Sequence, residues 1–173
     1  MLTGAGAVEY DEVVLATHAD ASLRLLMNPS IAERRLLGAW SYQDNPVTLH
    51  HDTSVLHTEP KLWGSWNMRR EADGEGYRIS YYLNRLQSLQ TRKPVILTLG
   101  DVSLDSSSVV KKFNYRHPVF TAPSVATQTS LDSLNGVDRI YYCGSYFGYG
   151  FHEDAVRSAV NVAARFGVCF GQD

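Results

Sequence analysis

A glycine-rich turn with titratable residues directly behind it is the strongest candidate for a binding site in this sequence. Glycines stand at positions 144, 148 and 150, and residues 152–154 are His, Glu and Asp. Glycine allows positive φ and lets a ligand approach the backbone closely. If the turn leads into a helix, the first N–H groups of that helix are unpaired and suit a polar or anionic ligand. The same pattern also suits a tight strand-to-helix connection that binds nothing.

The segments on either side of this turn predict the elements that would position it. The apolar run at 140–143 predicts a buried strand, and Gly167 predicts a helix C-cap. The expected helix between them presents an apolar face formed by Val156, Ala159, Val160 and Ala163. The turn is not a dinucleotide fingerprint, because no Gly-x-Gly-x-x-Gly opens the helix.

The first forty residues predict one strand and two short helices. The continuous apolar run 13–16 is typical of a buried strand in a parallel sheet. After a turn at 17–19, Asp20 is expected to cap a helix that continues to Leu26.

Two serines are expected at helix starts. Ser30 and Glu33 form a capping-box signature for a helix that ends near Gly38. Further along, Ser124 is expected to cap a helix that continues to Leu134.

The middle of the chain is rich in strand-forming residues. We expect a meander of four or five antiparallel strands, with the polar loop 71–76 as one hairpin. The candidate strands cover residues 47–51, 62–67, 77–83, 94–99 and 109–115.

Three histidines in this region raise the question of a metal site. His50 and His51 would point to opposite faces of a strand, and neither they nor His57 have a Cys or carboxylate at a recognised ligand spacing. We therefore expect no metal and interpret these histidines as solvated.

Composition limits the class of protein. The 173 residues suit one domain, with room for part of a second, and a net charge of −2 gives no reason to expect a nucleic-acid partner. No apolar run is long enough for a membrane span, and the N-terminus does not read as a secretory signal. Two cysteines make no disulfide framework, so we expect a cytoplasmic location.

Several segments resemble one protein family. Cys143-Gly144-Ser145-Tyr146, followed by residues 148–154, is similar to the C-terminal flavin-binding segment of predicted NAD/FAD-binding proteins. These are FAD-dependent oxidoreductases of the flavin-containing amine oxidase-like superfamily. The resemblance extends to residues 10–20, Trp66-Asn67, 82–87 and 117–120, and so spans most of the chain.

The resemblance implies an α/β (α+β) fold. Partial FAD-binding elements, an N-terminal strand and a C-terminal strand-turn-helix, would surround an antiparallel or mixed sheet that forms the substrate domain. The expected divisions are 1–38 for the end of the FAD-binding domain and linking helices, 39–120 for the substrate domain, and 121–173 for the return helix and the C-terminal FAD-binding segment.

The resemblance also implies cofactor-binding residues. Gly144 and Ser145 would lie near the FAD pyrophosphate, and the backbone N–H groups of Asp154 and Ala155 would point to the flavin pyrimidine edge. Amine oxidases more often have Gly-Ala at this point, so Asp154 departs from the broad pattern. The full implied set is Gly144, Ser145, Tyr146, Gly150, Phe151, His152, Glu153, Asp154, Ala155 and His18.

Each of these assignments has a structural alternative. His18 also suits a turn histidine bonded to the backbone, and His152 and Glu153 also suit a helix cap. The implied substrate residues are Trp66, Asn67, Tyr82 and Asn84. Cross-strand aromatic packing and hydrogen-bonded amides are the structural alternative for those four, and for each residue taken alone we favour it slightly. No catalytic base is assigned.

The family begins with a strand and a Gly-x-Gly-x-x-Gly turn that this sequence lacks. We therefore expect the C-terminal part of a larger flavoprotein, which oxidises a small organic molecule and alone binds FAD weakly or not at all. A missing N-terminal half or self-association would supply the partner. The alternative is a non-catalytic module whose aromatic sheet face binds an apolar ligand or a partner chain. A Ser or Cys hydrolase is disfavoured, because Gly144-Ser145 lacks the Gly-x-Ser-x-Gly elbow.

Overall fold

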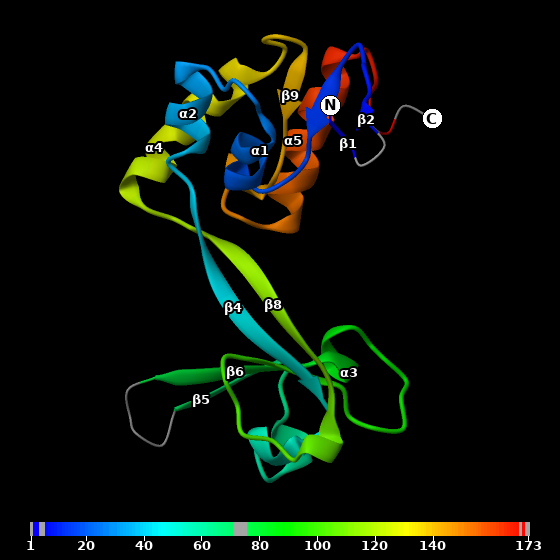
Figure 1. Cartoon of the computed structure of the whole chain (residues 1–173). Coiled ribbons are helices and arrows are strands. Elements are labelled where there is room, and N and C mark those ends of the chain that lie inside the picture. The colour runs from blue at the N-terminus through cyan, green and yellow to red at the C-terminus, as the bar shows by residue number, and fades with distance from the viewer. Residues whose placement is uncertain (1, 4–5, 71–75, 170, 172–173) are drawn as a thin grey trace. The chain divides into compact units, whose positions relative to one another are not determined.

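The computed structural model describes residues 2–3, 6–70, 76–169 and 171, and it confirms a mixture of helices and strands (Figure 1). The chain divides into two compact units. The first comprises Met1–Gln43 and Pro118–Asp173, and the second comprises Asp44–His117. The unit boundaries therefore fall inside two strands, β4 (Ser41–His50) and β8 (Val109–Val119).

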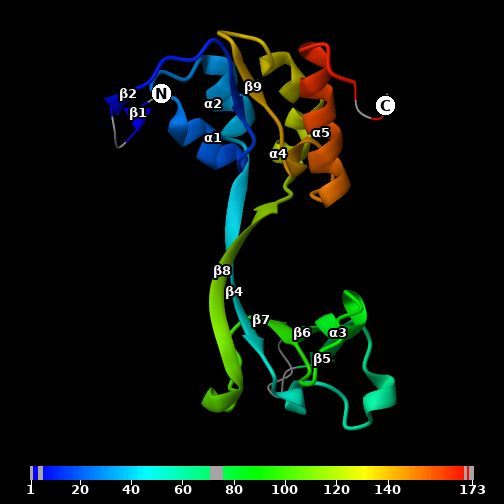
Figure 2. The ribbon, with the colours of Figure 1, turned by 90° about the vertical axis from the view of Figure 1, so that its right-hand side faces the viewer.

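A pair of parallel strands lies at the centre of the first unit. β3 (Val13–Leu15) pairs with β9 (Ile140–Tyr142), with Val13 opposite Ile140 and Leu15 opposite Tyr142. β9 is seen between α1 and α5 in two perpendicular views (Figures 1 and 2). The parallel strand expected at 13–16 is confirmed, as is the strand expected before the glycine turn.

Helices pack around this pair and form its core with it. The helices of the unit are α1 (Ala19–Leu25), α2 (Ile31–Leu37), α4 (Ala122–Leu131) and α5 (His152–Arg165). A short hairpin of β1 (Leu2–Thr3) and β2 (Gly6–Ala7) precedes them. The buried core residues are Leu15, Ala19, Leu36, Leu37, Trp40, Leu131, Leu134, Tyr142 and Tyr146. No described helix is long and apolar enough to cross a membrane.

The capping box at the start of α2 also ties this helix to β9. The Ser30 hydroxyl accepts from the Glu33 N–H, and the Glu33 carboxylate accepts from the Ser30 N–H, as expected. The same carboxylate accepts a 2.5 Å hydrogen bond from the hydroxyl of buried Tyr142. Burial raises the pKa of Glu33, but the hydrogen bonds from Tyr142 and Ser30 outweigh it and leave the pKa lowered. Burial and the adjacent carboxylate raise the pKa of Tyr142.

The residues expected as N-caps of α1 and α4 are wrong by a few positions. α1 begins after His18, and Asp20 lies inside its first turn, where it forms an ion pair with Arg24. α4 is capped by Thr121, and Ser124 is the reciprocal partner three residues later. In both cases a residue with capping chemistry is used, but in the first turn instead of before it.

The apolar face expected on α5 is wrong in part. Its buried residues are Asp154, Ser158 and Val162, spaced four apart, whereas Val156 is 49% exposed. Two polar side chains are buried because both bond the backbone of the preceding loop. The expected C-cap is confirmed, since Gly167 has φ 75° and its N–H bonds back to the last turn.

The second unit is built on a five-stranded antiparallel sheet of order β5-β6-β7-β4-β8. Besides β4 and β8 it contains β5 (Trp66–Arg70), β6 (Tyr77–Tyr82) and β7 (Ile96–Leu99), with the one-turn helix α3 (Leu83–Leu86). The expected simple meander is wrong, because β4 is first in sequence yet lies between β7 and β8. β5 and β6 pair as the predicted hairpin requires, while 71–75 of its loop lie outside the described residues.

One face of this sheet carries a small hydrophobic core and, beside it, buried polar side chains that are hydrogen-bonded in series. Val55, Leu56 and Ile96 are its buried apolar residues. Beside them, His50 is fully buried, so its interpretation as a solvated histidine is wrong. His50 Nδ1 accepts from the Asp52 N–H, so the neutral ring donates from Nε2 to Thr98 Oγ1 at 2.8 Å.

Removing the Tyr142 hydroxyl should destabilise the first unit. Tyr142→Phe deletes a buried bond to a carboxylate, so we expect the free energy of unfolding to fall by about 1 to 3 kcal/mol. Urea denaturation measures it. Tyr149→Phe, at an exposed tyrosine, is the matched control. Equal stability of the two variants would contradict this role for Tyr142.

The stability of the second unit should depend on the protonation of His50. Burial lowers its pKa from the ordinary 6.5, and neighbouring His51 adds to this, while Asp52 opposes it. Well above pH 6.5 the ring is neutral in both the folded and the unfolded state. Below it the unfolded chain takes up a proton that the folded chain excludes, so stability falls by at most about 1.4 kcal/mol per pH unit.

Hydrogen exchange of β6 and β7 amides from about pH 7.5 to about pH 5.5, corrected for intrinsic exchange, measures this dependence. His50→Gln should remove it. His57→Gln, at an exposed histidine, should retain it. An unchanged pH dependence in His50→Gln would show that other groups cause it.

Candidate functional site

The carboxyl ends of β3 and β9 bring two predicted segments together. Parallel strands end at the same edge of a sheet, which is where α/β proteins bind ligands. The turn containing Thr17 follows β3, and Gly144 follows β9. A Cβ built on Gly144, whose φ is +156°, would lie 3.4 Å from the Thr17 carbonyl oxygen and 2.7 Å from the Tyr146 ring. Only glycine therefore fits where the two segments meet.

The donors of the glycine loop are partly used within the protein. The Gly144 N–H donates to Ser158 Oγ at 2.9 Å, which anchors the loop to α5. A 3-10 turn at Ser145–Phe147 follows, and Tyr146 in it belongs to the core. Burial raises the pKa of the Tyr146 phenol. Gly144 and Tyr146 therefore hold the loop in place, and the Gly144 N–H is not available to a ligand.

Asp154 organises the rest of the loop. Its carboxylate is buried, accepts from the N–H groups of Tyr149 at 2.9 Å and Phe151 at 3.1 Å, and forms an ion pair with Arg157. A Cβ on Gly148 would overlap this carboxylate. The residue that departs from the amine oxidase pattern thus closes the loop onto the start of α5.

The first turn of α5 retains open donors. Within the described part of the chain, no hydrogen-bond partner is found for the N–H groups of His152, Glu153 and Asp154. The Ala155 N–H donates to the Phe151 carbonyl at 3.3 Å and belongs to the helix ladder. The His152 and Glu153 side chains are exposed, as is the Phe151 ring. Three N–H groups of a positive helix end can therefore meet a polar ligand edge.

His18 lies near the same edge, and its side chain contacts another residue of the first unit. It precedes α1, and its ring stacks on Tyr42 with centroids 4.3 Å apart and an interplanar angle of 15°. The Tyr42 hydroxyl also accepts from the Ala19 N–H at 2.8 Å. Both contacts stabilise the turn after β3.

The pocket beside α5 is small. Its volume is about 190 Å³, whereas drug-sized ligands occupy pockets of roughly 300 to 1,000 Å³. It is lined by Gln128, Asp132, Asn135, Phe147, Asp154, Arg157, Ser158 and Asn161. The pocket lies below that range, so it does not enclose a ligand of that size.

The sheet of the second unit separates Trp66 from Asn67. Neighbouring residues of a strand point to opposite faces. Trp66 is 70% exposed, and its ring meets the Tyr81 ring edge-on at 5.4 Å. Asn67 points to the core face, where its amide bonds both the N–H and the carbonyl of Gly64.

Tyr82 and Asn84 also serve the core side of the unit. The Tyr82 ring packs edge-on against Trp63 at 5.3 Å. Asn84 Oδ1 accepts from the Val95 N–H at 2.6 Å, and Asn84 Nδ2 donates to Thr91 Oγ1 at 2.7 Å. Of the four predicted substrate residues, only Trp66 lies on the less covered face. Tyr81 lies beside Trp66 on this face. The two-residue alternation of side chains along a strand would have predicted Tyr81, and not Tyr82, as the residue that shares a face with Trp66.

A larger groove, of about 880 Å³, runs along β5. Trp66 and Asn67 line it together with residues of the 53–64 segment, including Leu62 and Trp63. Among the described residues, no cluster of three or more His, Cys, Asp or Glu side chains is arranged to hold a metal ion.

The sequence matches no known protein-family model, and no curated protein is significantly similar to it.

Asp154→Asn should loosen the loop before α5. The amide loses the charge that holds two backbone donors, so we expect a stability loss of about 1 to 3 kcal/mol. Amide exchange at Tyr149 and Phe151 should quicken, which NMR measures. Asp101→Asn, at an exposed position, is the control. Unchanged exchange at both amides would contradict this role for Asp154.

Proposed function

We propose that this chain forms the C-terminal part of an FAD-dependent oxidoreductase of the amine oxidase-like kind. The observation that supports this best is the meeting of the Thr17 turn, the Gly144 loop and the open start of α5 beyond the parallel pair. Ligands of α/β proteins bind at this edge, and a helix start there suits a polar cofactor edge.

The small size of the parallel sheet supports a larger fold. Parallel sheets are normally covered on both faces and have more than two strands. In the described part of the chain β3 pairs only with β9, and Val14 in the middle of β3 is 46% exposed. A dinucleotide-binding half that adds parallel strands beside β3 would complete the sheet.

The residues at the start of α5 fit the polar edge of a flavin. The N–H groups of His152, Glu153 and Asp154 would donate to it, while Gly144 and Asp154 fix the loop internally. A bound flavin would supply the redox chemistry, by taking up the hydride of a substrate C–H group while the neighbouring C–N or C–C single bond becomes a double bond. The chain itself orients the ring through this helix start.

The isolated chain is expected to bind FAD weakly or not at all, because the adjoining pocket of about 190 Å³ is too small to enclose it. The partner is a dinucleotide-binding half. Cys143 and Cys169 are both free thiols, which supports the proposal of a cytoplasmic location. The alternative function, a non-catalytic module for an apolar ligand or partner chain, needs no flavin.

Co-expression with a dinucleotide-binding half tests the proposal and the role of α5. We expect the pair to purify with bound FAD and to turn over an organic substrate. His152→Pro should weaken FAD binding about tenfold, because it removes one N–H donor at a helix position that tolerates proline. FAD titration followed by flavin fluorescence measures the affinity.

His152→Ala is the matched control, because it keeps the N–H group and removes only the side chain. It should bind FAD as the parent does. Equal weakening by both variants would assign the effect to the imidazole instead. Absence of flavin from every pairing would favour the non-catalytic alternative.

A further inference from the structure

The strand β5 lies at one edge of the second unit's sheet and, within the described residues, pairs only with β6. The Tyr82 N–H donates to the Ser65 carbonyl at 3.0 Å, which makes these two residues a hydrogen-bonded pair of the antiparallel ladder. Backbone groups along a strand point alternately to its two sides. Those of Trp66, Met68 and Arg70 therefore point away from β6, to the outer edge of the sheet.

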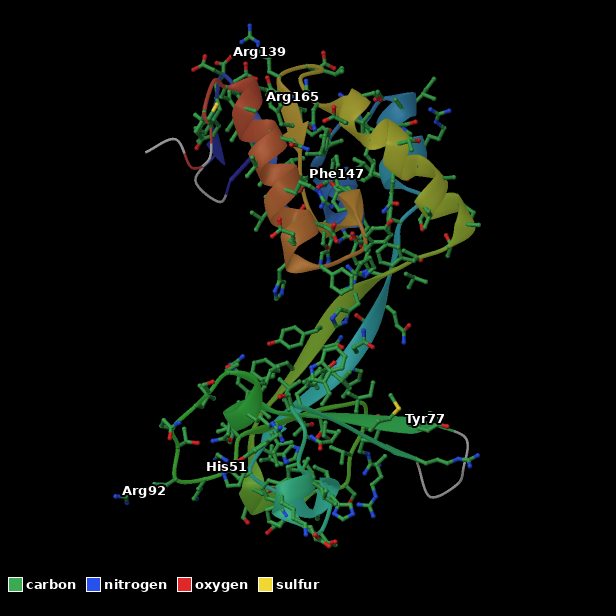
Figure 3. The ribbon with its side chains drawn as sticks, turned by 180° about the vertical axis from the view of Figure 1, so that it is seen from behind. His51, Tyr77, Arg92, Arg139, Phe147 and Arg165 are labelled. Atoms are coloured by element: carbon green, nitrogen blue, oxygen red, sulfur yellow. The ribbon has the colours of Figure 1, made fainter. Side chains whose placement is uncertain are left out.

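The outer side of β5 has room for another strand. The groove of about 880 Å³ runs along it, and the side chains of Trp66 and Met68 are 70% and 68% exposed. Among the described residues, no partner is found for the backbone N–H and carbonyl of Met68. Figure 3 shows Tyr77, which lies opposite Arg70 where β5 ends. The edge is therefore open at the middle of the strand.

The two edges of the sheet differ in their protection against strand addition. β8 forms the other edge and contains Lys111, Lys112 and Pro118, which are residue types that block such pairing. β5 contains neither lysine nor proline. Pairing of β5 with β8 of the next copy would continue into an open chain of molecules, whereas pairing of β5 with itself closes as a dimer. The difference between the edges therefore favours a symmetric pair.

The sequence of β5 restricts the register of such a pair. In a symmetric antiparallel pair, one residue lies opposite itself in the second copy. A pair centred on Arg69 or Arg70 would put two like charges directly opposite each other, which is destabilising. A pair centred on Trp66 or Asn67 would use only part of the strand. One central residue remains, which is Met68.

A pair centred on Met68 uses all five residues of β5. Arg69 then lies opposite the uncharged Asn67 of the second copy. Arg70 lies opposite Trp66 of the second copy, and the face of an indole ring attracts a cation. The backbone groups of Trp66, Met68 and Arg70, which point outward, also meet one another in this register. Charge and backbone alternation therefore select the same register.

We infer that two copies of this chain associate through the outer edges of β5, antiparallel and centred on Met68. The occupant of this edge is a second copy, and the two five-stranded sheets join into one continuous sheet. The inference goes beyond the proposed function and requires no flavin.

Disulfide crosslinking of the full chain tests the register. Every variant also carries Cys169→Ser, which removes the exposed native thiol, whereas Cys143 is buried. Met68→Cys should give a disulfide-linked dimer with oxidised glutathione, which non-reducing electrophoresis detects. The reason is that the Cα atoms of a hydrogen-bonded pair lie about 5.5 Å apart, within the reach of a disulfide.

Trp66→Cys and Arg70→Cys are the matched controls. In this register residue 66 lies about 13 Å from residue 66 of the second copy, too far for a disulfide. Neither variant alone should crosslink, but an equal mixture of the two should, because residues 66 and 70 lie opposite each other. Crosslinking of either variant alone would overturn the inference, as would its absence from Met68→Cys or from the mixture.

Sedimentation equilibrium measures the association without a crosslink. Met68→Pro removes an N–H group that β6 does not use, so it should weaken dimerisation at least about tenfold. Met68→Ala keeps this N–H group and should dimerise within about threefold of the parent. Hydrogen exchange of β6 amides checks that both variants are folded. A parent chain that is monomeric at about 100 μM, or a dimer that Met68→Pro leaves unchanged, would contradict the inference.

Discussion

The parallel pairing of β3 with β9 is the constraint on which the first unit depends. It joins segments more than a hundred residues apart, and its two carboxyl ends determine where the Thr17 turn and the Gly144 loop lie. Parallel strands cannot be joined by a short turn, so the intervening chain must leave and return. The hydrogen bond from Tyr142 to Glu33 then fixes α2 against β9.

Local patterns with one dominant physical cause were predictable from the sequence. The apolar run 13–16, the Ser30–Glu33 capping box and Gly167 each depend on residues within one turn or strand, and the structure contains all three. The caps of α1 and α4 were less predictable, because Asp20 and Ser124 also suit the first turn of a helix.

Features that depend on tertiary contacts were not predictable in this way. His50 is buried because Thr98 on another strand offers its hydroxyl, and Ser158 is buried because the Gly144 N–H, fourteen residues earlier, donates to its hydroxyl. The position of β4 inside the sheet is likewise a long-range property. Among the candidate site residues, Trp66 and Asn67 are adjacent in sequence and were predicted to act at one site. Strand alternation puts their side chains on opposite faces of the sheet.

The second unit enters and leaves the first on two strands that are neighbours in one sheet, β4 and β8. It is therefore an insertion, and the distance between its two ends is set by strand pairing and not by what lies between them. Loops can lengthen and side chains can change within the second unit without altering the path of the chain around β3 and β9. Such an arrangement lets the sequence of the second unit vary while the scaffold that carries this unit stays the same.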